Sequence, residues 1–248
     1  KAWLHLRVNR IYKAAAKIVA LSDGMKLQIL KHGIADEKVL VSYNGTSLNA
    51  FPFRQRMPDD KLTIIYTGTV GLANGVHILA DVSKLLEADG IENVDFIVLG
   101  AGNDLERVKA YSVSRKVKNI QFLDAVPKEE VAGLLAKADL GVVTFATFPV
   151  LEANSANKFY DYLASGLPVL LNYEGWQAGY LEKWNCGKFS KMGDTRAFAD
   201  NIRWMLDHPE ARQEMSLNAR RLAESHFDRV AIASELLREF HQILDRHS

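Results

Sequence analysis

Apolar and polar positions along the chain follow two different periods. Short, continuous apolar runs bounded by turn residues predict buried strands, and longer stretches with apolar residues three or four apart predict helices. Strands are predicted at 17–22, 38–43, 62–68, 94–100, 119–125, 140–145, 168–173 and, more weakly, 186–190. Helices are predicted at 75–88, 103–115, 128–137, 154–165, 176–184, 195–207, 209–225 and 228–246.

Between Gly68 and Cys186, each predicted strand is followed by a predicted helix. Continuous apolar strands that alternate with helices indicate an α/β fold with a doubly wound parallel sheet, Rossmann-like, here closed by C-terminal helices. Ligands of such sheets bind beyond the carboxyl ends of the strands, where the strand order reverses. This directs attention to the loops after Gly68, Gly100, Ala125 and Phe145.

The segment "FPFRQRMPDDK", residues 51–61, interrupts this alternation with two prolines and five charged residues, and is interpreted as a linker. The elements predicted before it are too few to complete a doubly wound domain. We therefore expect residues 1–50 to be the tail of a larger N-terminal domain missing from this chain. Residues 62–227 form the predicted ligand-binding domain, and 228–248 a separate C-terminal helix.

Composition narrows the function classes. The 31 Lys+Arg and 30 Asp+Glu residues nearly cancel, so charge implies no nucleic-acid partner. A single cysteine, Cys186, favours a reducing compartment, and we expect a cytoplasmic protein. Residues 1–17 form a basic amphipathic stretch containing Trp3 and Ile11. It is interpreted as a helix packed on a neighbouring part of the protein, with peripheral contact at the inner membrane face as the alternative.

Two glycine-rich loops follow predicted strands. In "YTGTVGLANG" (66–75), Gly68 and Gly71 allow backbone N–H groups to approach a phosphate, although such loops also serve simply to turn the chain. In "VLGAGND" (98–104), Gly100 and Gly102 lack the third glycine of a dinucleotide-binding motif. A structural turn or a ligand contact is possible at this second loop.

The stretch "NSANKFYDYLASGLPVLLNY" predicts a helix whose N-cap is Asn154 or Ser155 and whose end lies at Gly166. Lys158 and Asp161 are three residues apart and share a helix face. Two interpretations remain open. The two side chains form an intrahelical ion pair, or Lys158 binds a phosphate while Asp161 accepts hydrogen bonds from two vicinal sugar hydroxyls.

No metal-binding pattern is evident, since the sequence lacks a His-Glu-x-x-His motif and paired cysteines. The histidines are scattered, and the adjacent acidic pairs fall in the linker and at a helix start. We therefore expect no metal and no cofactor, and chemistry that rests on handling phosphate groups.

Several segments, taken together in this order, resemble the donor-binding half of a retaining glycosyltransferase of the GT-B fold, family four. The segments that carry the resemblance are "VLVSYNGTSLNAF" (39–51), "YTGTVGLANG" (66–75), "FIVLGAG" (96–102), "NIQFLDAVPKEEVAGLLAKADLGVVTF" (119–145), "NKFYDYLASGLPVL" (157–170) and "ARRLAESHFDRVAIASELLREF" (219–240). The resemblance covers essentially the whole chain. The Asn157–Lys158 pair is closest in style to transferases of aminodeoxysugars in bacterial surface-polysaccharide synthesis.

Two departures from the family pattern concern the site. The family often has two Glu residues eight positions apart; here Asp161 occupies the second position and Ala153 the first, with Glu152 one place away. The resemblance leads us to expect Glu152 at the sugar hydroxyls. The family's first donor loop usually carries Arg and Lys, where this chain has Thr69 and Asn74, which we still expect to contact the donor.

The resemblance implies transfer of a sugar from a nucleotide diphosphate sugar to an acceptor hydroxyl, with retention of configuration and without a metal. Lys158, the Gly71 N–H group and the N–H groups at Asn157 and Lys158 are expected to stabilise the leaving diphosphate. Asp161 is expected to hold the ribose and Val126 to flank the base.

The resemblance also implies that the missing N-terminal domain supplies the binding site for a sugar or lipid-linked acceptor, and that helix 228–246 crosses back to it. We then expect Val230, Leu236, Phe240 and Leu244 to form an exposed apolar face on that helix. This chain alone is expected to bind nucleotide and to transfer little or no sugar. The alternative is a non-catalytic nucleotide-sugar-binding or scaffold module that needs a separate partner.

Overall fold

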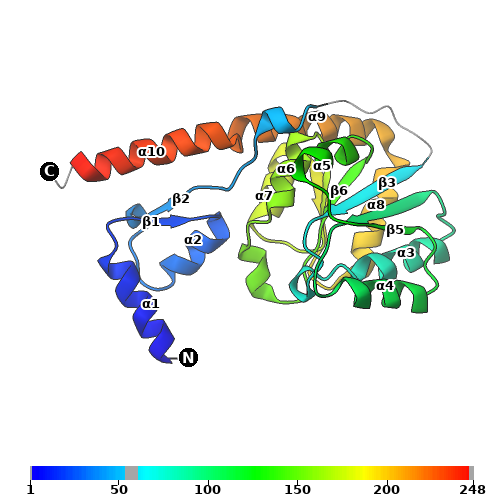
Figure 1. The fold of residues 1–248 in the computed structure, drawn as a ribbon, viewed down its shortest axis with the longest axis horizontal. Helices are drawn as coiled ribbons and strands as arrows, with labels where there is room; N and C mark the ends of the chain where they lie inside the picture. The colour runs from blue at the N-terminus through cyan, green and yellow to red at the C-terminus, as the bar shows by residue number, and fades with distance from the viewer. Residues whose placement is uncertain (1, 54–60, 246–248) are drawn as a thin grey trace.

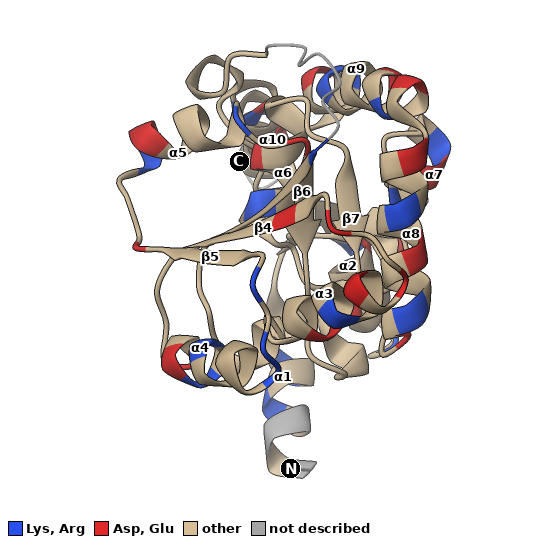
Figure 2. Cartoon of the chain, turned by 90° about the vertical axis from the view of Figure 1, so that its right-hand side faces the viewer, with Lys and Arg blue, Asp and Glu red and all other residues tan. Residues whose placement is uncertain are grey.

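The computed structural model describes residues 2–53 and 61–245. Figure 1 shows a large α/β domain beside a smaller N-terminal part, with the last helix lying along that smaller part. Figure 2 shows that the Lys, Arg, Asp and Glu positions fall mainly on the outer helices of the α/β domain, while the strands carry mostly uncharged residues. This is the distribution expected for a sheet buried on both faces.

The α/β domain contains a six-stranded parallel sheet with the order β5-β4-β3-β6-β7-β8. Its strands are β3 (Leu62–Thr67), β4 (Val94–Leu99), β5 (Ile120–Leu123), β6 (Leu140–Val143), β7 (Val169–Leu171) and β8 (Gly187–Phe189). The chain builds outward in one direction from β3 and in the other from β6. The order therefore reverses between these two strands, which is where doubly wound sheets bind ligands.

Helices cover both faces of this sheet, because successive side chains of each buried strand point to opposite sides. Ile64 and Tyr66 belong to one apolar cluster and Ile65 to the other. The first cluster packs against α3 (Ile78–Ala88), α4 (Leu105–Ser114) and α8 (Thr195–Asp207). The second packs against α5 (Lys128–Leu135), α6 (Asn157–Ala164), α7 (Trp176–Trp184) and α9 (Pro209–His226).

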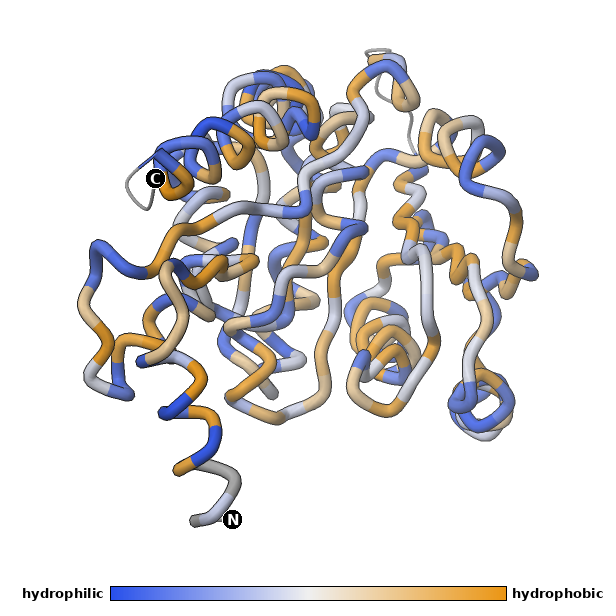
Figure 3. The backbone as a smooth tube through the Cα atoms, turned by 60° about the vertical axis from the view of Figure 1, so that its left-hand side comes forward, coloured by the Kyte–Doolittle hydropathy of each residue, from blue (hydrophilic) through white to orange (hydrophobic). Residues whose placement is uncertain are grey.

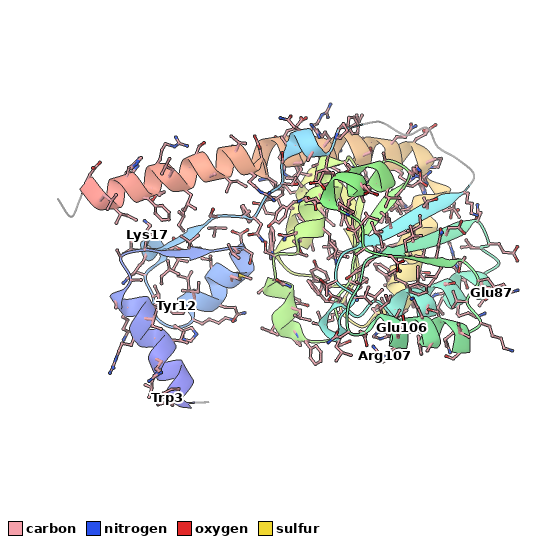
Figure 4. The ribbon with its side chains drawn as sticks, viewed as in Figure 1. Trp3, Tyr12, Lys17, Glu87, Glu106 and Arg107 are labelled. Atoms are coloured by element: carbon pink, nitrogen blue, oxygen red, sulfur yellow. The ribbon has the colours of Figure 1, made fainter. Side chains whose placement is uncertain are left out.

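The N-terminal part consists of a two-stranded parallel sheet and two helices. Its elements are α1 (Ala2–Ala14), β1 (Ile18–Ala20), α2 (Asp23–Leu30) and β2 (Val39–Val41). In Figure 3, α1 extends away from the rest of the chain, with hydrophobic and hydrophilic residues alternating along it. Figure 4 places Trp3 near the free end of α1, far from the α/β domain. No helix in the described ranges is long and apolar enough to cross a membrane.

The chain passes between the two parts twice, at neighbouring places. Residues 43–46 lead out of the N-terminal part, and residues 227–229 lead into α10 (Arg229–Asp245). The Thr46 N–H donates to the Phe227 carbonyl at 2.9 Å, and the Arg229 N–H donates to the Thr46 carbonyl at 3.0 Å. Farther along α10, Glu239 lies 3.8 Å from the Lys17 ammonium. The crossings are thus joined to each other and to the N-terminal part.

Each helix and strand predicted in the described ranges is present, usually with its ends shortened by a few residues. Short 3-10 helices were not predicted: η1 (Asp36–Lys38), η2 (Leu48–Ala50), η3 (Leu72–Asn74) and η4 (Pro149–Ala153). Of the predicted linker, residues 54–60 lie outside the described residues. Phe51, at its start, is buried in the core of the α/β domain with 1% of its surface exposed.

Two local predictions are wrong. The N-cap of α6 is Ala156, which makes no side-chain capping hydrogen bond; the Ser155 hydroxyl instead meets the Tyr160 hydroxyl at 2.6 Å. On α10, Val230, Phe240 and Leu244 are exposed as predicted, but Leu236 lines a groove with residues of β2 and is partly buried. Leu236 shares a helix face with Phe240, four residues on, so the difference lies in its surroundings, since Leu236 is at the level of Leu40 and Val41 of β2.

Candidate functional site

A cleft of about 400 Å³ opens at the carboxyl edge of the sheet, beside the reversal between β3 and β6. A neighbouring hollow of about 350 Å³ shares part of its wall, including Gly68 and Val126. The cleft is lined by Thr67, Gly68, Thr69, Asn74, Val126, Lys128, Val131, Phe145, Asn154, Ala156, Asn157, Lys158 and Asp161. The strand-to-helix loops of both halves of the sheet therefore meet at one site.

Most residues predicted for the site line this cleft. They are Gly68, Thr69, Asn74, Val126, Asn157, Lys158 and Asp161, while Gly100 lines the neighbouring hollow. Gly71, Gly102 and Glu152 are absent from the described lining of both. The sequence interpretation missed Lys128 and Phe145, which also line the cleft. The loop after Phe145 was singled out, but no local pattern marked these two side chains.

Lys158 extends from the first turn of α6 toward the loop after β3. Its ammonium nitrogen lies 3.8 Å from the centroid of the Tyr66 ring, and its Cε atom would lie 3.4 Å from a Cβ at Gly68. No carboxylate of a described residue lies within ion-pair distance of it. Burial lowers the pKa of the Lys158 ammonium from 10.5 to about 7. The cleft thus contains a cation that pairs with no carboxylate among the described residues.

The start of α6 adds backbone donors to this cation. Because Ala156 cannot cap the helix, the N–H groups of Asn157 and Lys158 have no acceptor in the described part of the chain. Free N–H groups and the helix dipole together attract an anion at a helix N-terminus. Asn157 is exposed, and its side-chain oxygen accepts a hydrogen bond from the Asn44 side chain at 2.9 Å.

The loop after β3 faces α6 across the cleft. The N–H groups of Gly68 and Val70 already donate to the carbonyls of Leu99 and Ala101, each at 2.9 Å. Those of Thr69 and Gly71 have no acceptor among the described residues. The loop is fixed by the Tyr66 hydroxyl, which donates to the Thr69 carbonyl at 2.6 Å. Thr69 and Gly71, rather than Gly68, are therefore the residues with N–H groups available to a ligand.

Gly100 and Gly102 explain why the loop after β4 lies so close to the loop after β3. A Cβ atom at Gly100 would lie 1.9 Å from the Gly68 carbonyl oxygen, and one at Gly102 would lie 2.1 Å from the Val70 carbonyl oxygen. Only glycine fits such a close approach of backbone to backbone. The structural interpretation therefore holds for both residues, with Gly100 also reaching the wall of the neighbouring hollow.

Asp161 lies one turn beyond Lys158 and does not pair with it. Its Oδ1 atom accepts a hydrogen bond from the Thr46 hydroxyl at 2.6 Å, and the Lys128 ammonium lies 3.6 Å from the same oxygen. The interpretation of Lys158 and Asp161 as an intrahelical ion pair is therefore wrong, because the two side chains diverge toward different neighbours. With 15% of its side chain exposed, Asp161 presents a carboxylate to the cleft.

Glu152 is not brought to the cleft. It belongs to η4, where its backbone oxygen lies 2.6 Å from the place a Cβ of Gly175 would occupy. Its charge is felt by Tyr173, whose pKa is raised well above 10.0, mainly by burial and in smaller part by Tyr160 and Glu152. Glu152 lies in a 3-10 turn that the sequence pattern did not predict. Across the described residues, no group of three or more His, Cys, Asp or Glu is placed to hold a metal ion.

The fold and the cleft together define a doubly wound α/β domain with an anion-binding site at the point where the strand order reverses. Residues 49–222 match the family described as glycosyl transferases group 1, and the chain belongs to this family. The match spans the whole α/β sheet and the helices that form the cleft.

Individual relatives are distant in sequence. The chain is 21% identical, over 235 residues, to the capsular polysaccharide biosynthesis glycosyltransferase CapM of Staphylococcus aureus, covering 90% of this chain and 60% of that protein. Among solved structures, Anabaena HepE in complex with UDP-glucose matches with a TM-score of 0.79 at 19% identity, covering 96% of this chain and 67% of that one.

Sucrose-phosphate synthase from Thermosynechococcus elongatus matches with a TM-score of 0.80 at 17% identity, covering 99% of this chain and 63% of that one. At such low identity these likenesses establish the fold alone. The chain spans about 60% of the length of CapM, so each of these proteins is longer than the present chain.

Proposed function

We propose that the protein containing this chain transfers a sugar from a nucleotide diphosphate sugar to an acceptor hydroxyl, with retention of configuration, and that this chain holds the donor. One observation carries the proposal. The ammonium of Lys158, which pairs with no carboxylate among the described residues, and the free N–H groups at the start of α6 lie across the cleft from Thr69, whose N–H group is also free. Family membership and the UDP-glucose in HepE support the same ligand class.

The diphosphate is the group these donors suit. As the bond to the sugar breaks, negative charge builds on the departing diphosphate, and preorganised donors stabilise that charge in the transition state. Lys158 and the N–H groups of α6 would bind it from one side, and the N–H group of Thr69 from the other. This arrangement supplies the charge stabilisation from the protein itself, so transfer is proposed to be independent of a metal ion.

The ribose and the base are proposed to bind to the other residues that line the cleft. Asp161 would accept hydrogen bonds from the two ribose hydroxyls, since a carboxylate has two oxygens suited to vicinal donors. The apolar side chains of Val126 and Val131, which line both the cleft and the neighbouring hollow, would flank the base. Lys128, 3.6 Å from Asp161, adds a positive charge beside that carboxylate.

Acceptor binding is proposed to lie in a further N-terminal domain outside this chain, since about a third of the length of the structural relatives lies outside the match. The relationship to CapM supports a role in surface-polysaccharide synthesis. The reaction is proposed to take place at the cytoplasmic side of the membrane. Trp3 and Ile11 of α1 are 62% and 66% exposed, and the Arg7 guanidinium lies over the Trp3 ring at 3.8 Å. An apolar and basic helix of this kind suits an anionic membrane surface.

The proposal is tested first by calorimetry of this chain with UDP, GDP and ADP, and then with Lys158→Ala. We expect one nucleoside diphosphate to bind, and the substitution to weaken it at least tenfold. In the protein that contains this chain, turnover should fall by about 10²–10³, the usual effect of removing one preorganised donor.

Lys109→Ala is the matched control, because Lys109 lies on α4, away from the cleft lining, and pairs with Glu106. It should leave binding and turnover unchanged. Turnover of Lys158→Ala within twofold of the unsubstituted protein would refute the role of Lys158. Nucleotide binding without any transfer by the longer protein would favour a non-catalytic module.

A further inference from the structure

The first crossing of the chain, residues 43–46, contacts the helix that carries the proposed donor site. The Asn44 side chain donates to Asn157 at 2.9 Å, and the Asn44 backbone interacts with the Tyr160 hydroxyl. The Thr46 hydroxyl donates to Asp161 at 2.6 Å. These three contacts follow one face of α6 from its first residue through its second turn. The crossing is therefore part of the wall behind the site.

The position of the Thr46 hydroxyl is set by its own backbone. Thr46 is fully buried, its N–H donates to the Phe227 carbonyl, and its carbonyl accepts from the Arg229 N–H. Gly45, beside it, has a φ of +55°, and a Cβ there would lie 2.7 Å from the Phe227 carbonyl oxygen. The backbone N–H and carbonyl of Thr46 are thus both fixed by residues of the second crossing. The hydroxyl can serve as a fixed donor to a neighbour.

Asp161 needs such a donor if it is to bind two vicinal hydroxyls. Its Oδ1 atom is engaged by Thr46 and lies near Lys128, whereas no described residue donates a hydrogen bond to Oδ2. A carboxylate fixed through one oxygen loses little further freedom when the other oxygen accepts a ligand. An unfixed Asp161 would have to be ordered at the moment of binding.

We propose that Thr46 is a positioning residue for the nucleotide donor, acting through Asp161. Its hydroxyl orients the Asp161 carboxylate toward the ribose hydroxyls, so that ribose recognition depends on a residue of the crossing segment. The inference rests on the proposed function, because it assigns Asp161 to the ribose. It adds a residue that does not itself line the cleft.

The test compares ribose and deoxyribose ligands. Thr46→Val keeps the shape of the side chain and removes its hydroxyl, and Thr46→Ser restores a hydroxyl. Affinities for UDP, GDP and ADP and for their 2′-deoxy counterparts are measured by calorimetry on this chain. Ser112→Ala, which removes a buried hydroxyl bonded to its own helix on α4, is the control.

We expect the unsubstituted chain to prefer the ribonucleotide by about tenfold, the effect of one hydrogen bond to a charged group. Thr46→Val should lose most of this preference, binding the ribonucleotide about tenfold more weakly and the deoxynucleotide with a smaller change. Thr46→Ser and Ser112→Ala should keep the preference. A purely structural role would weaken both ligands equally.

The outcomes separate this inference from the proposed function. Equal losses for both ligands, or none, in a Thr46→Val chain that binds nucleotide would overturn the role of Thr46 and leave the donor site standing. Failure of the unsubstituted chain to bind any of the three nucleotides would overturn both. If Thr46→Val does not fold, Thr46→Ala, which introduces no new atoms, replaces it. The same ratio of ribonucleotide affinity to deoxynucleotide affinity is then measured.

Discussion

The Lys158 ammonium lies 3.8 Å from the centroid of the Tyr66 ring, and this contact stands where an ion pair would be expected. An aromatic face attracts a cation without neutralising it. Tyr66 is fully buried, and its own hydroxyl is engaged by the Thr69 carbonyl, so the ring is fixed under the ammonium. The amine is therefore held in place while its charge stays available to an incoming anion.

This contact predicts a pH dependence of nucleotide binding. Burial lowers the pKa of Lys158 to about 7, so the free protein loses this charge as the pH rises through 7. A bound diphosphate favours the charged form and raises the pKa, so binding takes up a proton above pH 7. Affinity should fall by up to about tenfold for each pH unit between 7 and 9, and flatten below 7.

Calorimetry in two buffers of different ionisation enthalpy measures this proton uptake directly. The range above pH 7 is chosen because the phosphate itself titrates near pH 6. Lys158→Gln should bind more weakly with an affinity that no longer changes over this range. A slope that survives in Lys158→Gln would assign the titration to another group.

Asp161→Asn should weaken ribonucleotide binding by about tenfold or more while the chain stays folded. The substitution keeps the shape of the side chain but replaces one acceptor oxygen by an amide, which cannot accept from a second hydroxyl. Calorimetry gives the affinity, and thermal unfolding followed by circular dichroism gives the stability. Unchanged affinity would leave Asp161 as a structural partner of Thr46 only.

Gly102→Ala should destabilise the chain and weaken nucleotide binding together. A Cβ atom at this position would lie 2.1 Å from the Val70 carbonyl oxygen, so the loops after β3 and β4 must separate. We expect a loss of about 1–3 kcal/mol in the free energy of unfolding, as is usual for overpacking. Chemical denaturation measures it.

Gly179→Ala is the opposite case and serves as the control. Gly179 lies inside α7, and a Cβ atom there would meet no atom within 4 Å. Alanine is favoured over glycine in a helix by about 1 kcal/mol, so this variant should be more stable and should bind nucleotide normally. Equal effects of the two substitutions would show that the close approach of the loops is not what requires glycine.

Asn172→Leu should lower stability more than an average core substitution. The Asn172 side chain, on the turn after β7, accepts from the Phe145 N–H and donates to the Phe145 carbonyl, both at 2.8 Å. Leucine would leave both buried backbone groups without partners, at a cost of about 1–3 kcal/mol each. Unfolding in denaturant measures the loss, and an unaffected midpoint would contradict the assigned role.

The fold was predictable because its signals are local. The continuous apolar strands, the glycines after β3 and β4, and the Gly166 stop of α6 each follow from residues near one another in the chain. The topology then follows from the alternation of strands and helices, which permits few arrangements. Lys158 and Asp161 were singled out by a local pattern, because they share a face at the start of a helix, and the family resemblance then assigned them to the donor site.

The partners of these residues were not predictable. Thr46 and Asp161 are 115 positions apart, and no periodicity relates them. Lys158 has an acidic neighbour three residues on, and only the position of Tyr66 explains why it turns away. Glu152 was chosen only because it lies one place from the family's first Glu position, and in the structure it belongs to η4, outside the lining of the cleft.

The pairing of the two crossings brings the first and last parts of the chain close together in space. Helix α10, the last element, packs against one of the earliest: Ile232 and Leu236 share a groove with Leu40 and Val41 of β2. A shortened version ending near residue 227 would therefore remove the α10 residues that lie beside β2 in the N-terminal part. Because this groove and the Lys17–Glu239 ion pair link α10 to the N-terminal part, truncation at either end of the chain should take the other end into account.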